Sequence, residues 1–459
     1  MTKEEIKIVI KKQREFFDSK KTLDINTRLF YLKKLKKIIL ENEMKIGDAI
    51  RKDLGKSYFE GYMCEPGLVV SELSYMIKHT KAFSKEKNVL TPLTHFKSRS
   101  FKKPMPYGVV LIMSPWNYPF LLTMDPLIDA VASGNTVIVK PSAYSPHTSE
   151  VIREILENVF PKEYVCAVMG GREENNHLLS DKFDYIFFTG SKEVGKKVLE
   201  KASSYLTPAT LELGGKSPCI IDKNANIKLA AKRVVFGKYL NCGQTCVAPD
   251  YIMCEESVKD EFLSYVKYEI EKQFGSDALN SPDYGKIINE KHFERITALI
   301  DEKKVYFGGG YNKETLKIEP TVMDNITWED AVMKEEIFGP VMPVLTFNKI
   351  EDVINTVNSY DKPLALYVFS DDKNVTKKVM EECAFGGGCI NDTIIHLATS
   401  NMGFGGVGES GMGSYHGKTG FDTFSHYKSI VDKKTWLDLP MRYQPYTKLY
   451  DKLIHMFLK

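Results

Sequence analysis

The sequence has no long hydrophobic run and little cysteine. No stretch approaches the roughly 20 apolar residues that a membrane-spanning helix needs. The N-terminal stretch MTKEEIKIVIKKQREFF has charges scattered through it, where a secretory signal would have an uninterrupted apolar segment. Eight cysteines in 459 residues lack the density of a small disulfide-rich secreted domain. These absences predict a cytoplasmic protein without a membrane span.

The sequence also lacks an excess of charge of either sign. Lys and Arg total 63 against 60 Asp and Glu, which leaves a net charge of +3, so the balance predicts no nucleic-acid partner. Hydrophobic residues make up 43% and charged residues 27%, which is ordinary for a globular protein. The length predicts two or three domains, each large enough for its own core.

Strand and helix patterns alternate after a helical N-terminal region of about 85 residues. The apolar, β-branched runs are 108–114, 136–142, 164–170 and 184–190, and helical patterns separate them at 123–133, 146–160 and 192–205. Continuous apolar strands alternating with helices predict a parallel sheet covered on both faces, in a doubly wound dinucleotide-binding domain. A second strand–helix series is expected to open with residues 207–222, after a boundary near residue 211.

Two other regions are not expected to belong to either series. Residues 88–108 are interrupted by prolines and are expected to form an extended excursion. Near the C-terminus an apolar helix face is predicted, made of Tyr446, Leu449, Leu453, Met456 and Phe457. We expect this tail to pack on its own domain or on a partner subunit, with weak association with a membrane surface as the alternative.

Three short segments hold residues that could bind a ligand or act as catalysts. FTGSKEVGKKVLE (188–200) places Gly190 at a strand–helix turn that could cradle a pyrophosphate, although G-x-G-x-x-G is absent and a plain turn fits equally well. SPWNYPF (114–120) follows a strand, so Asn117 could bind an oxyanion or cap the next helix. LELGGKSP (211–218) has Glu212 in an apolar strand, as a general base or in a structural salt bridge.

NCGQTC (241–246) contains two cysteines four positions apart. This spacing, without nearby histidines, is poor for zinc, and a disulfide is not expected in a reducing compartment. Cys246 follows Gly243 and Thr245 in a predicted loop, where a thiol is placed for nucleophilic attack, whereas Cys242 could close the preceding helix. For either cysteine the alternative is a small buried apolar side chain.

Six motifs occur in the order seen in aldehyde dehydrogenases: SPWNYP, FTGS, LELGGKSP, NCGQTCVAPD, EEIFGPV and FGGVGESGMG. The sequence resembles this family from about residue 5 to 430, and it is similar to the shorter class 3 branch of fatty and aromatic aldehyde dehydrogenases. The resemblance implies an α/β fold with a Rossmann-type dinucleotide-binding domain, an α/β catalytic domain, a bridging β arm and a tail. The dinucleotide-binding domain is expected at 1–85 and 106–211, and the catalytic domain at 212–391. The bridging arm is expected at 86–105 and 392–430, and the tail at 431–459.

The resemblance also implies the reaction, which is NAD(P)-dependent oxidation of an aldehyde to a carboxylic acid. Cys246 is expected to add to the aldehyde as a thiolate and form a thiohemiacetal, whose oxyanion Asn117 would stabilise. Hydride transfer then leaves a thioester on Cys246, and Glu212 activates the water that hydrolyses it. A CoA-acylating relative would generally lack this glutamate, and a catalytically silent binding protein should have lost Cys246, Glu212 or Asn117. No metal is expected.

Cofactor and partner expectations follow from the same motifs. The residues expected to bind NAD or NADP are Lys140, Gly190, Ser191, Gly195, Glu336, Phe338 and Trp116. Class 3 relatives commonly have a glutamate three positions after the lysine, where it can bond the ribose hydroxyls. This chain has Ala143 there, which leaves the choice between NAD and NADP open. The resemblance further implies a homodimer, in which the bridging arm adds strands to a partner subunit.

Overall fold

The apolar runs after Gly108 form a six-stranded sheet, in a computed structural model that describes residues 1–458. The strand order is β17-β7-β6-β3-β4-β5, and all strands except the antiparallel edge strand β17 are parallel. The bounds are β3 Val109–Met113, β4 Thr136–Lys140, β5 Val165–Ala167, β6 Tyr185–Thr189, β7 Ala209–Glu212 and β17 Gly411–Met412. Every residue of β3 and β4 is buried, which agrees with the predicted sheet covered on both faces.

Three helices of the first domain begin close to the predicted starts at 123, 146 and 192, and the others include the five helices of the helical N-terminal region. The helices are α1 Lys3–Asp18, α2 Ile25–Glu41, α3 Glu43–Leu54, α4 Tyr58–Cys64, α5 Pro66–Phe83, α6 Leu121–Ser133, α7 Pro146–Val159, α8 Arg172–Leu179 and α9 Lys192–Ser203. Asp24 caps α2, because its carboxylate accepts from the N–H groups of Asn26 and Thr27 at 3.2 and 3.0 Å. Leu32, Leu35 and Ile39 bury the apolar face of α2 in the core.

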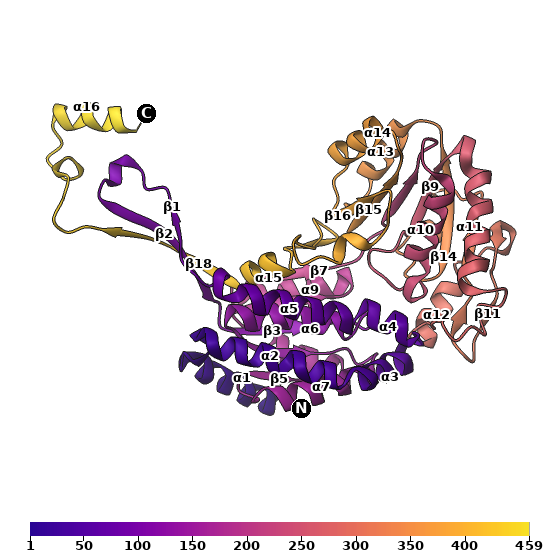
Figure 1. Ribbon diagram of the computed structural model, residues 1–459, viewed down its shortest axis with the longest axis horizontal. Helices are drawn as coiled ribbons and strands as arrows, with labels where there is room; N and C mark the ends of the chain where they lie inside the picture. Colours follow the sequence, from indigo (N-terminus) through magenta and orange to yellow (C-terminus); the bar gives the residue numbers. More distant parts are fainter. Residues whose placement is uncertain (459) are drawn as a thin grey trace.

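The second domain is built on a seven-stranded sheet of order β10-β13-β14-β9-β8-β15-β16, with β10 antiparallel to its neighbour. Its strands are β8 Pro218–Ile221, β9 Tyr251–Glu255, β10 Val305–Phe307, β13 Thr321–Met323, β14 Val341–Phe347, β15 Ala365–Phe369 and β16 Gly387–Ile390. Its helices are α10 Ile227–Tyr239, α11 Lys259–Phe274, α12 Glu290–Thr297, α13 Ile350–Ser359 and α14 Lys373–Glu382, and β11 Tyr311–Asn312 pairs with β12 Lys317–Ile318. The two domains stand side by side (Figure 1).

Residues 207–222 do not open the second series as a unit. Strand β7 pairs with β6 in the first sheet, and the chain crosses to the second sheet between Glu212 and Pro218. Because β7 follows α9 as the next parallel strand of the first sheet, LELGG (211–215) contains the end of that strand and the start of the link to the second domain. Glu212 therefore lies at the end of a strand of the dinucleotide-binding domain, at its junction with the second domain.

A three-stranded antiparallel arm projects from the first domain (Figure 1). It consists of β1 Lys87–Val89, β2 Ser98–Pro106 and β18 Ser425–Lys433. The expectation that all of residues 392–430 belong to the arm is wrong. Strand β17 joins the first sheet, and α15 Gly417–Thr423 packs on α5 and α6, because Phe421 and Phe424 are buried in the core of that domain.

The C-terminal tail forms the predicted helix, α16 Lys448–Phe457, but not with the predicted packing on its own domain. The helix lies at the far end of the arm (Figure 1), and Leu449 and Met456 are 63% and 61% exposed. Among residues 1–458, no helix combines the length and the apolar character that crossing a bilayer requires.

Candidate active site

A cavity of about 650 Å³ lies at the junction of the two domains. Eight of the ten residues predicted for the site line it: Trp116, Asn117, Gly190, Ser191, Glu212, Cys246, Glu336 and Phe338. Residues from second-domain elements, such as Tyr251 and His292, complete the wall. The remaining two predicted residues, Lys140 and Gly195, are not part of the lining. The fold thus gathers the cysteine, carboxylate and amide candidates from three separate segments of the chain.

The loop that carries Cys246 begins with a tight left-handed turn. Asn241, Cys242 and Gly243 have φ values of 53°, 52° and 70°, a region that favours glycine. A Cβ at Gly243 would lie 2.2 Å from the backbone oxygen of Gly339, so a side chain cannot fit there. This close approach fixes the start of the loop against the segment that contains Glu336.

Gln244 holds the same loop through three hydrogen bonds, although its side chain is fully buried. Its Nε2 donates to the carbonyls of Asn241 and Lys286, both at 3.0 Å, and its Oε1 accepts from the N–H of Ile288 at 3.0 Å. A buried amide with all of these partners is strongly oriented. The loop before Cys246 is therefore tied to the segment 286–288 of the second domain.

The two cysteines of the loop lie in different surroundings. Cys246 is partly exposed to the cavity, whereas Cys242 is buried in the apolar core of the second domain. Burial raises the pKa of the Cys246 thiol to about 12, the carboxylates of Glu336 and Glu212 add to the rise, and the backbone N–H groups of Cys246 and Val247 oppose it. Burial also raises the pKa of the Cys242 thiol. Of the two, Cys246 is the thiol that a ligand in the cavity can reach.

Glu212 ends β7 with its side chain 2% exposed. Within residues 1–458, neither carboxylate oxygen has a hydrogen-bond partner, so the structural salt bridge considered from the sequence is not formed. Burial alone raises the pKa of this carboxyl well above its usual range. A buried carboxyl without partners at the cavity wall retains its acceptor capacity for a ligand or a water molecule.

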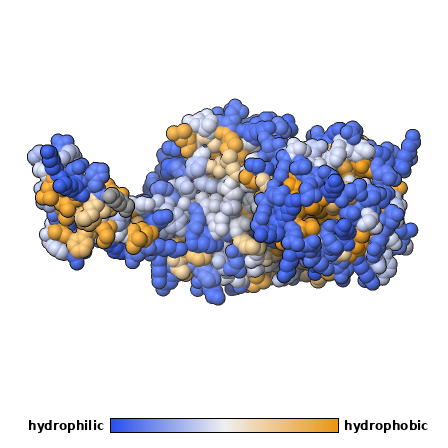
Figure 2. All heavy atoms as spheres, turned by 90° about the horizontal axis from the view of Figure 1, so that it is seen from above, coloured by the Kyte–Doolittle hydropathy of each residue, from blue (hydrophilic) through white to orange (hydrophobic). Residues whose placement is uncertain are grey.

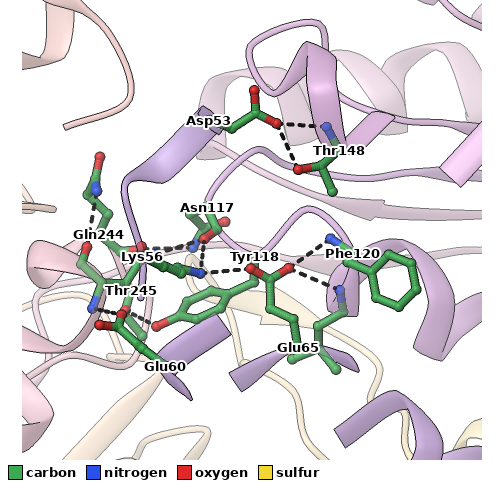
Figure 3. Close-up of polar contacts among 12 residues, drawn as sticks. Asp53, Lys56, Glu60, Glu65, Asn117, Tyr118, Phe120, Thr148, Gln244 and Thr245 are labelled. Atoms are coloured by element: carbon green, nitrogen blue, oxygen red, sulfur yellow. Dashed lines mark hydrogen bonds and ion pairs between the residues drawn. The ribbon is translucent and has the colours of Figure 1, made fainter. Parts of the chain in front are cut away.

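Asn117 is buried, and its side chain faces the cysteine loop (Figure 3). The Nδ2 group donates one hydrogen to the backbone oxygen of Gln244 at 3.0 Å, which orients the amide and leaves its second hydrogen unused by that bond. The predicted alternative, that Asn117 caps the next helix, is wrong. The carboxylate of Glu65 instead accepts from the N–H groups of Phe120 and Leu121, at 2.8 and 3.4 Å, where α6 begins.

The strand–helix turn after β6 leaves open backbone donors at the start of α9. Ser191 is the N-cap of α9 and makes no side-chain capping bond. The N–H groups at the start of a helix carry a partial positive charge and are suited to binding phosphate. A Cβ at Gly190 would lie 2.6 Å from the ring of Phe188, so the turn is tight at this position.

Gly195 has a packing role inside α9 rather than a place on the cavity wall. A Cβ added there would lie 2.8 Å from a methyl carbon of Leu213, so the absence of a side chain lets the helix approach the segment after β7. The residue therefore sets the position of α9, and through it the position of the turn at Gly190.

Glu336, Phe338 and Trp116 also line the cavity. A Cβ at Gly214 would lie 2.2 Å from Oε2 of Glu336, so glycine in LELGG is needed for this carboxylate to pack against the domain link. Burial, and secondly the negative charge of Asp250, raises the pKa of Glu336 to about 8. The rings of Trp116 and Phe338 meet edge to face with centroids 5.4 Å apart.

Lys140 ends β4 and is buried at 3% exposure. Its Nζ donates to the backbone oxygens of Pro141 and Gly170 at 2.8 and 2.7 Å, which leaves one N–H of the ammonium for a ligand. Burial lowers the pKa of Lys140 to about 8. Ala143, three residues further on, is exposed and presents neither charge nor bulk.

Lys56 and Glu65 are two residues of the site region that the sequence reasoning missed. Both are completely buried, and Lys56 Nζ lies 2.8 Å from Oε1 of Glu65 (Figure 3). Lys56 stands between α3 and α4, and Glu65 between α4 and α5, in a region that reads as ordinary amphipathic helix. No local motif marks these residues, because their partners lie about 60 residues away: the bond from Lys56 to the Asn117 carbonyl spans 61 positions.

Comparisons with known proteins identify the family and several relatives of this chain. A model of the "Aldehyde dehydrogenase family" matches residues 1–430. The "4,4'-diaponeurosporen-aldehyde dehydrogenase" of Staphylococcus aureus is 46% identical over 448 residues, 97% of each chain. An "Aldehyde dehydrogenase, dimeric NADP-preferring" of Rattus norvegicus is 42% identical over 424 residues, which is 92% of this chain and 94% of the other. A solved structure of Staphylococcus aureus AldH in a substrate-bound state has 45% identity and a TM-score of 0.97 and covers 99% of both chains.

These relatives agree with the predicted reaction rather than with the CoA-acylating alternative. The family match and the relatives agree with the predicted class 3-like branch. The chain therefore belongs to the aldehyde dehydrogenase family and is an NAD(P)-dependent enzyme that oxidises an aldehyde to a carboxylic acid.

Proposed function

We propose that Cys246, Asn117 and Glu212 carry out this oxidation at the cavity between the domains. The observation that carries the proposal is the buried carboxyl of Glu212, without a partner, on the same cavity wall as the partly exposed Cys246 thiol and the oriented Asn117 amide. A carboxyl in this setting is costly to bury and contributes no salt bridge, so catalysis explains its presence better than stability does.

In the first step the Cys246 thiolate attacks the aldehyde carbon and forms a carbon–sulfur bond. The N–H groups of Cys246 and Val247 act in favour of the thiolate, against burial, which raises the pKa of this thiol to about 12. The carbonyl oxygen becomes an oxyanion, which accepts from the free N–H of Asn117 and from the backbone N–H of Cys246. Loss of one such donor typically costs about 10²–10³ in rate.

The second half of the reaction releases the product by hydrolysis. When bound, the nicotinamide cofactor would supply a hydride acceptor, and Cys246 would then hold the oxidised acyl group as a thioester. Glu212 then takes a proton from a water molecule as that water attacks the thioester carbon. The carbon–sulfur bond breaks, the carboxylic acid leaves, and the Cys246 thiolate is regenerated. Because Glu212 must be ionised for this step, its raised pKa places the rising limb of the pH profile well above the range of an ordinary carboxyl.

The residues present fit a dinucleotide cofactor. The open N–H groups at the start of α9 suit a pyrophosphate, and the tight turn at Gly190 supports a close approach to the backbone. Glu336 and Phe338 would hold the nicotinamide end, with Trp116 beside them, and Lys140 would hold the adenosine ribose through its remaining N–H.

We propose that the enzyme uses both NAD and NADP. A 2′-phosphate would carry a charge of up to about −2 at neutral pH, and the exposed Ala143 offers it neither repulsion nor steric conflict. Lys140 supplies a cation for it. The same alanine removes an acceptor for the ribose hydroxyls of NAD, at a loss of about 0.5–1.5 kcal/mol, so NAD binding is weakened without being abolished.

The substrate that we propose is a large apolar aldehyde, supported by the identity of 46% with the enzyme named for 4,4'-diaponeurosporen-aldehyde. The test is a panel of short, medium-chain, long-chain and aromatic aldehydes together with 4,4'-diaponeurosporen-aldehyde, followed by absorbance of the reduced cofactor. Each is run with NAD and NADP, with and without CoA. We expect kcat/KM to rise with apolar size and to be independent of CoA. A dependence on CoA, or a preference for short aldehydes, would overturn the respective part of the proposal.

We also propose that the enzyme is a homodimer joined through the arm. Apolar side chains gather on the arm (Figure 2), among them Leu90, Leu93 and Val431, which are 94%, 75% and 53% exposed. An exposed strand edge with apolar side chains beside it can pair with another chain. Sedimentation velocity should give a dimer for the parent and a monomer for Leu90→Asp/Leu93→Asp, and a parent that sediments as a monomer would contradict the proposal.

A cytoplasmic location is the compartment that we propose. All eight cysteines are free in the structure, although several, such as Cys219 and Cys254, belong to the cores. Free thiols are usual in a reducing compartment. Cell fractionation with an antibody against the chain would test this, and recovery in the membrane fraction would point instead to the tail helix as an anchor.

A further inference from the structure

The buried ion pair of Lys56 and Glu65 touches the Asn117 segment at several points (Figure 3). Lys56 Nζ donates to the backbone oxygen of Asn117 at 3.2 Å and lies 4.0 Å from the ring centre of Tyr118. The second oxygen of Glu65 accepts from the N–H of Phe120 at 2.8 Å. The pair therefore contacts the carbonyl of Asn117, the ring of Tyr118 and the N–H of Phe120, which lie within four consecutive residues.

This segment has few means of holding itself in place. Pro115 and Pro119 flank Asn117 and have no backbone N–H, so the turn between β3 and α6 has fewer donors for hydrogen bonds of its own. Side chains from elsewhere in the chain supply them. Asn241 adds a further bond, from its Nδ2 to the Asn117 carbonyl at 2.8 Å.

The network also reaches the nucleophile. The hydroxyl of Tyr118, under the ammonium of Lys56, is 2.6 Å from the hydroxyl of Thr245, the residue immediately before Cys246. Both proposed oxyanion donors, the Asn117 amide and the Cys246 N–H, are thus connected to one buried pair.

Stability does not explain why the chain keeps two charges here. Desolvation of a buried pair can exceed its Coulombic gain, and apolar replacements of similar volume are often neutral or stabilising. We propose that Lys56 and Glu65 are positioning residues for catalysis, which fix the Asn117 amide as an oxyanion donor by clamping the backbone of residues 117–120. The inference rests on the oxyanion role of Asn117 proposed above.

The test removes the pair as a unit with Lys56→Met/Glu65→Gln, because removal of one partner would leave a lone buried charge. The readout is the rate of the first burst of reduced cofactor, measured by rapid mixing. We expect this rate to fall about 10–100-fold, part of the loss that follows removal of one oxyanion donor. The aldehyde concentration that gives half the maximal burst rate should change by less than about threefold. A matched control is Lys259→Met/Asp324→Asn, which removes a pair with an N–O distance of 3.1 Å away from the cavity lining and should leave the burst rate unchanged.

The decisive comparison repeats the pair removal in an Asn117→Ala background. If the pair acts by orienting the Asn117 amide, the same change there should lower the burst rate by less than about threefold, because the oriented group is gone. The inference would be overturned if removal of the pair lowered the burst rate equally in both backgrounds, or by less than threefold in the parent. Lys56→Gln/Glu65→Gln keeps a neutral N–H donor near Asn117 and leaves no lone buried charge, and its cycle with Asn117→Ala decides the matter if Lys56→Met/Glu65→Gln does not fold. A burst rate that Asn117→Ala leaves unchanged would refute the proposed oxyanion role itself.

Discussion

Glu212→Gln tests the chemistry and the energetics of the buried carboxyl at once. The substitution keeps the shape of a side chain that is 2% exposed and whose two oxygens have no partner in the described chain. It removes only the ability to take a proton. General-base catalysis typically contributes about 10²–10⁴ in rate, so steady-state kcat should fall by that factor. The thioester forms without this base, so a burst of reduced cofactor of about one equivalent per site should survive.

The same substitution should change how stability depends on pH. Burial raises the pKa of Glu212 in the folded state, so ionisation of this carboxyl opposes folding. The parent therefore loses stability as the pH rises from the ordinary carboxyl pKa of the unfolded chain to the raised pKa of the folded protein. At a pH above both pKa values, each unit of upward shift lowers the stability of the parent by about 1.36 kcal/mol. Gln cannot ionise, so the stability of the variant relative to the parent should increase between pH 5 and pH 9.

Two assays check these outcomes. Rapid-mixing absorbance gives the burst amplitude and the later turnover, and thermal unfolding at pH 5 and pH 9 gives the relative stability. Loss of the burst along with turnover would show that Glu212 acts before or during acylation. A variant that loses stability relative to the parent as the pH rises would refute the reasoning from burial, since it would mean that the carboxylate has a favourable partner.

Three further predictions concern the cofactor and the cysteine loop. Ala143→Glu should lower kcat/KM with NADP and raise it modestly with NAD, as measured from initial rates. Another residue would select the cofactor if the ratio of kcat/KM for the two cofactors were unchanged in the variant. The same would follow if the parent preferred NAD by more than about a thousandfold, which is over 4 kcal/mol. Cys242→Ser should keep most of the activity, because this thiol lies in the core of the second domain, and a loss as large as that in Cys246→Ser would exchange the two assignments. Gly243→Ala should lower both the melting temperature and kcat, because its Cβ would lie 2.2 Å from the Gly339 carbonyl oxygen and its φ of 70° favours glycine. Activity and melting temperature equal to those of the parent would show that the turn can relax.

Local patterns in the sequence were sufficient for most elements of the fold. The β-branched runs predict β3, β4 and β6. The cap of α2 is also local, because the carboxylate of Asp24 accepts from N–H groups only two and three residues ahead. Sheet membership is a different matter. The assignment of β7 to the first sheet depends on pairing with β6, and no feature of residues 207–222 specifies that partner.

The same distinction divides the residues of the site. Motif order identifies Cys246, Glu212 and Asn117, and the structure brings them to one cavity. The clamp formed by Lys56 and Glu65 could not be predicted, because its effect arises from contacts between distant segments in a buried space. A lysine and a glutamate in an amphipathic helical region are ordinary surface residues until the tertiary fold removes water from them.

The central claim is that Cys246 carries the acyl group and Glu212 releases it. The most direct measurement is peptide mass spectrometry of the Glu212→Gln enzyme, quenched in acid after mixing with an aldehyde and the oxidised cofactor. The account predicts that a mass increase equal to the acyl group accumulates on Cys246 and not on Cys242, with close to one equivalent per site. An acyl group on Cys242, or turnover in Cys246→Ser without any adduct, would contradict it.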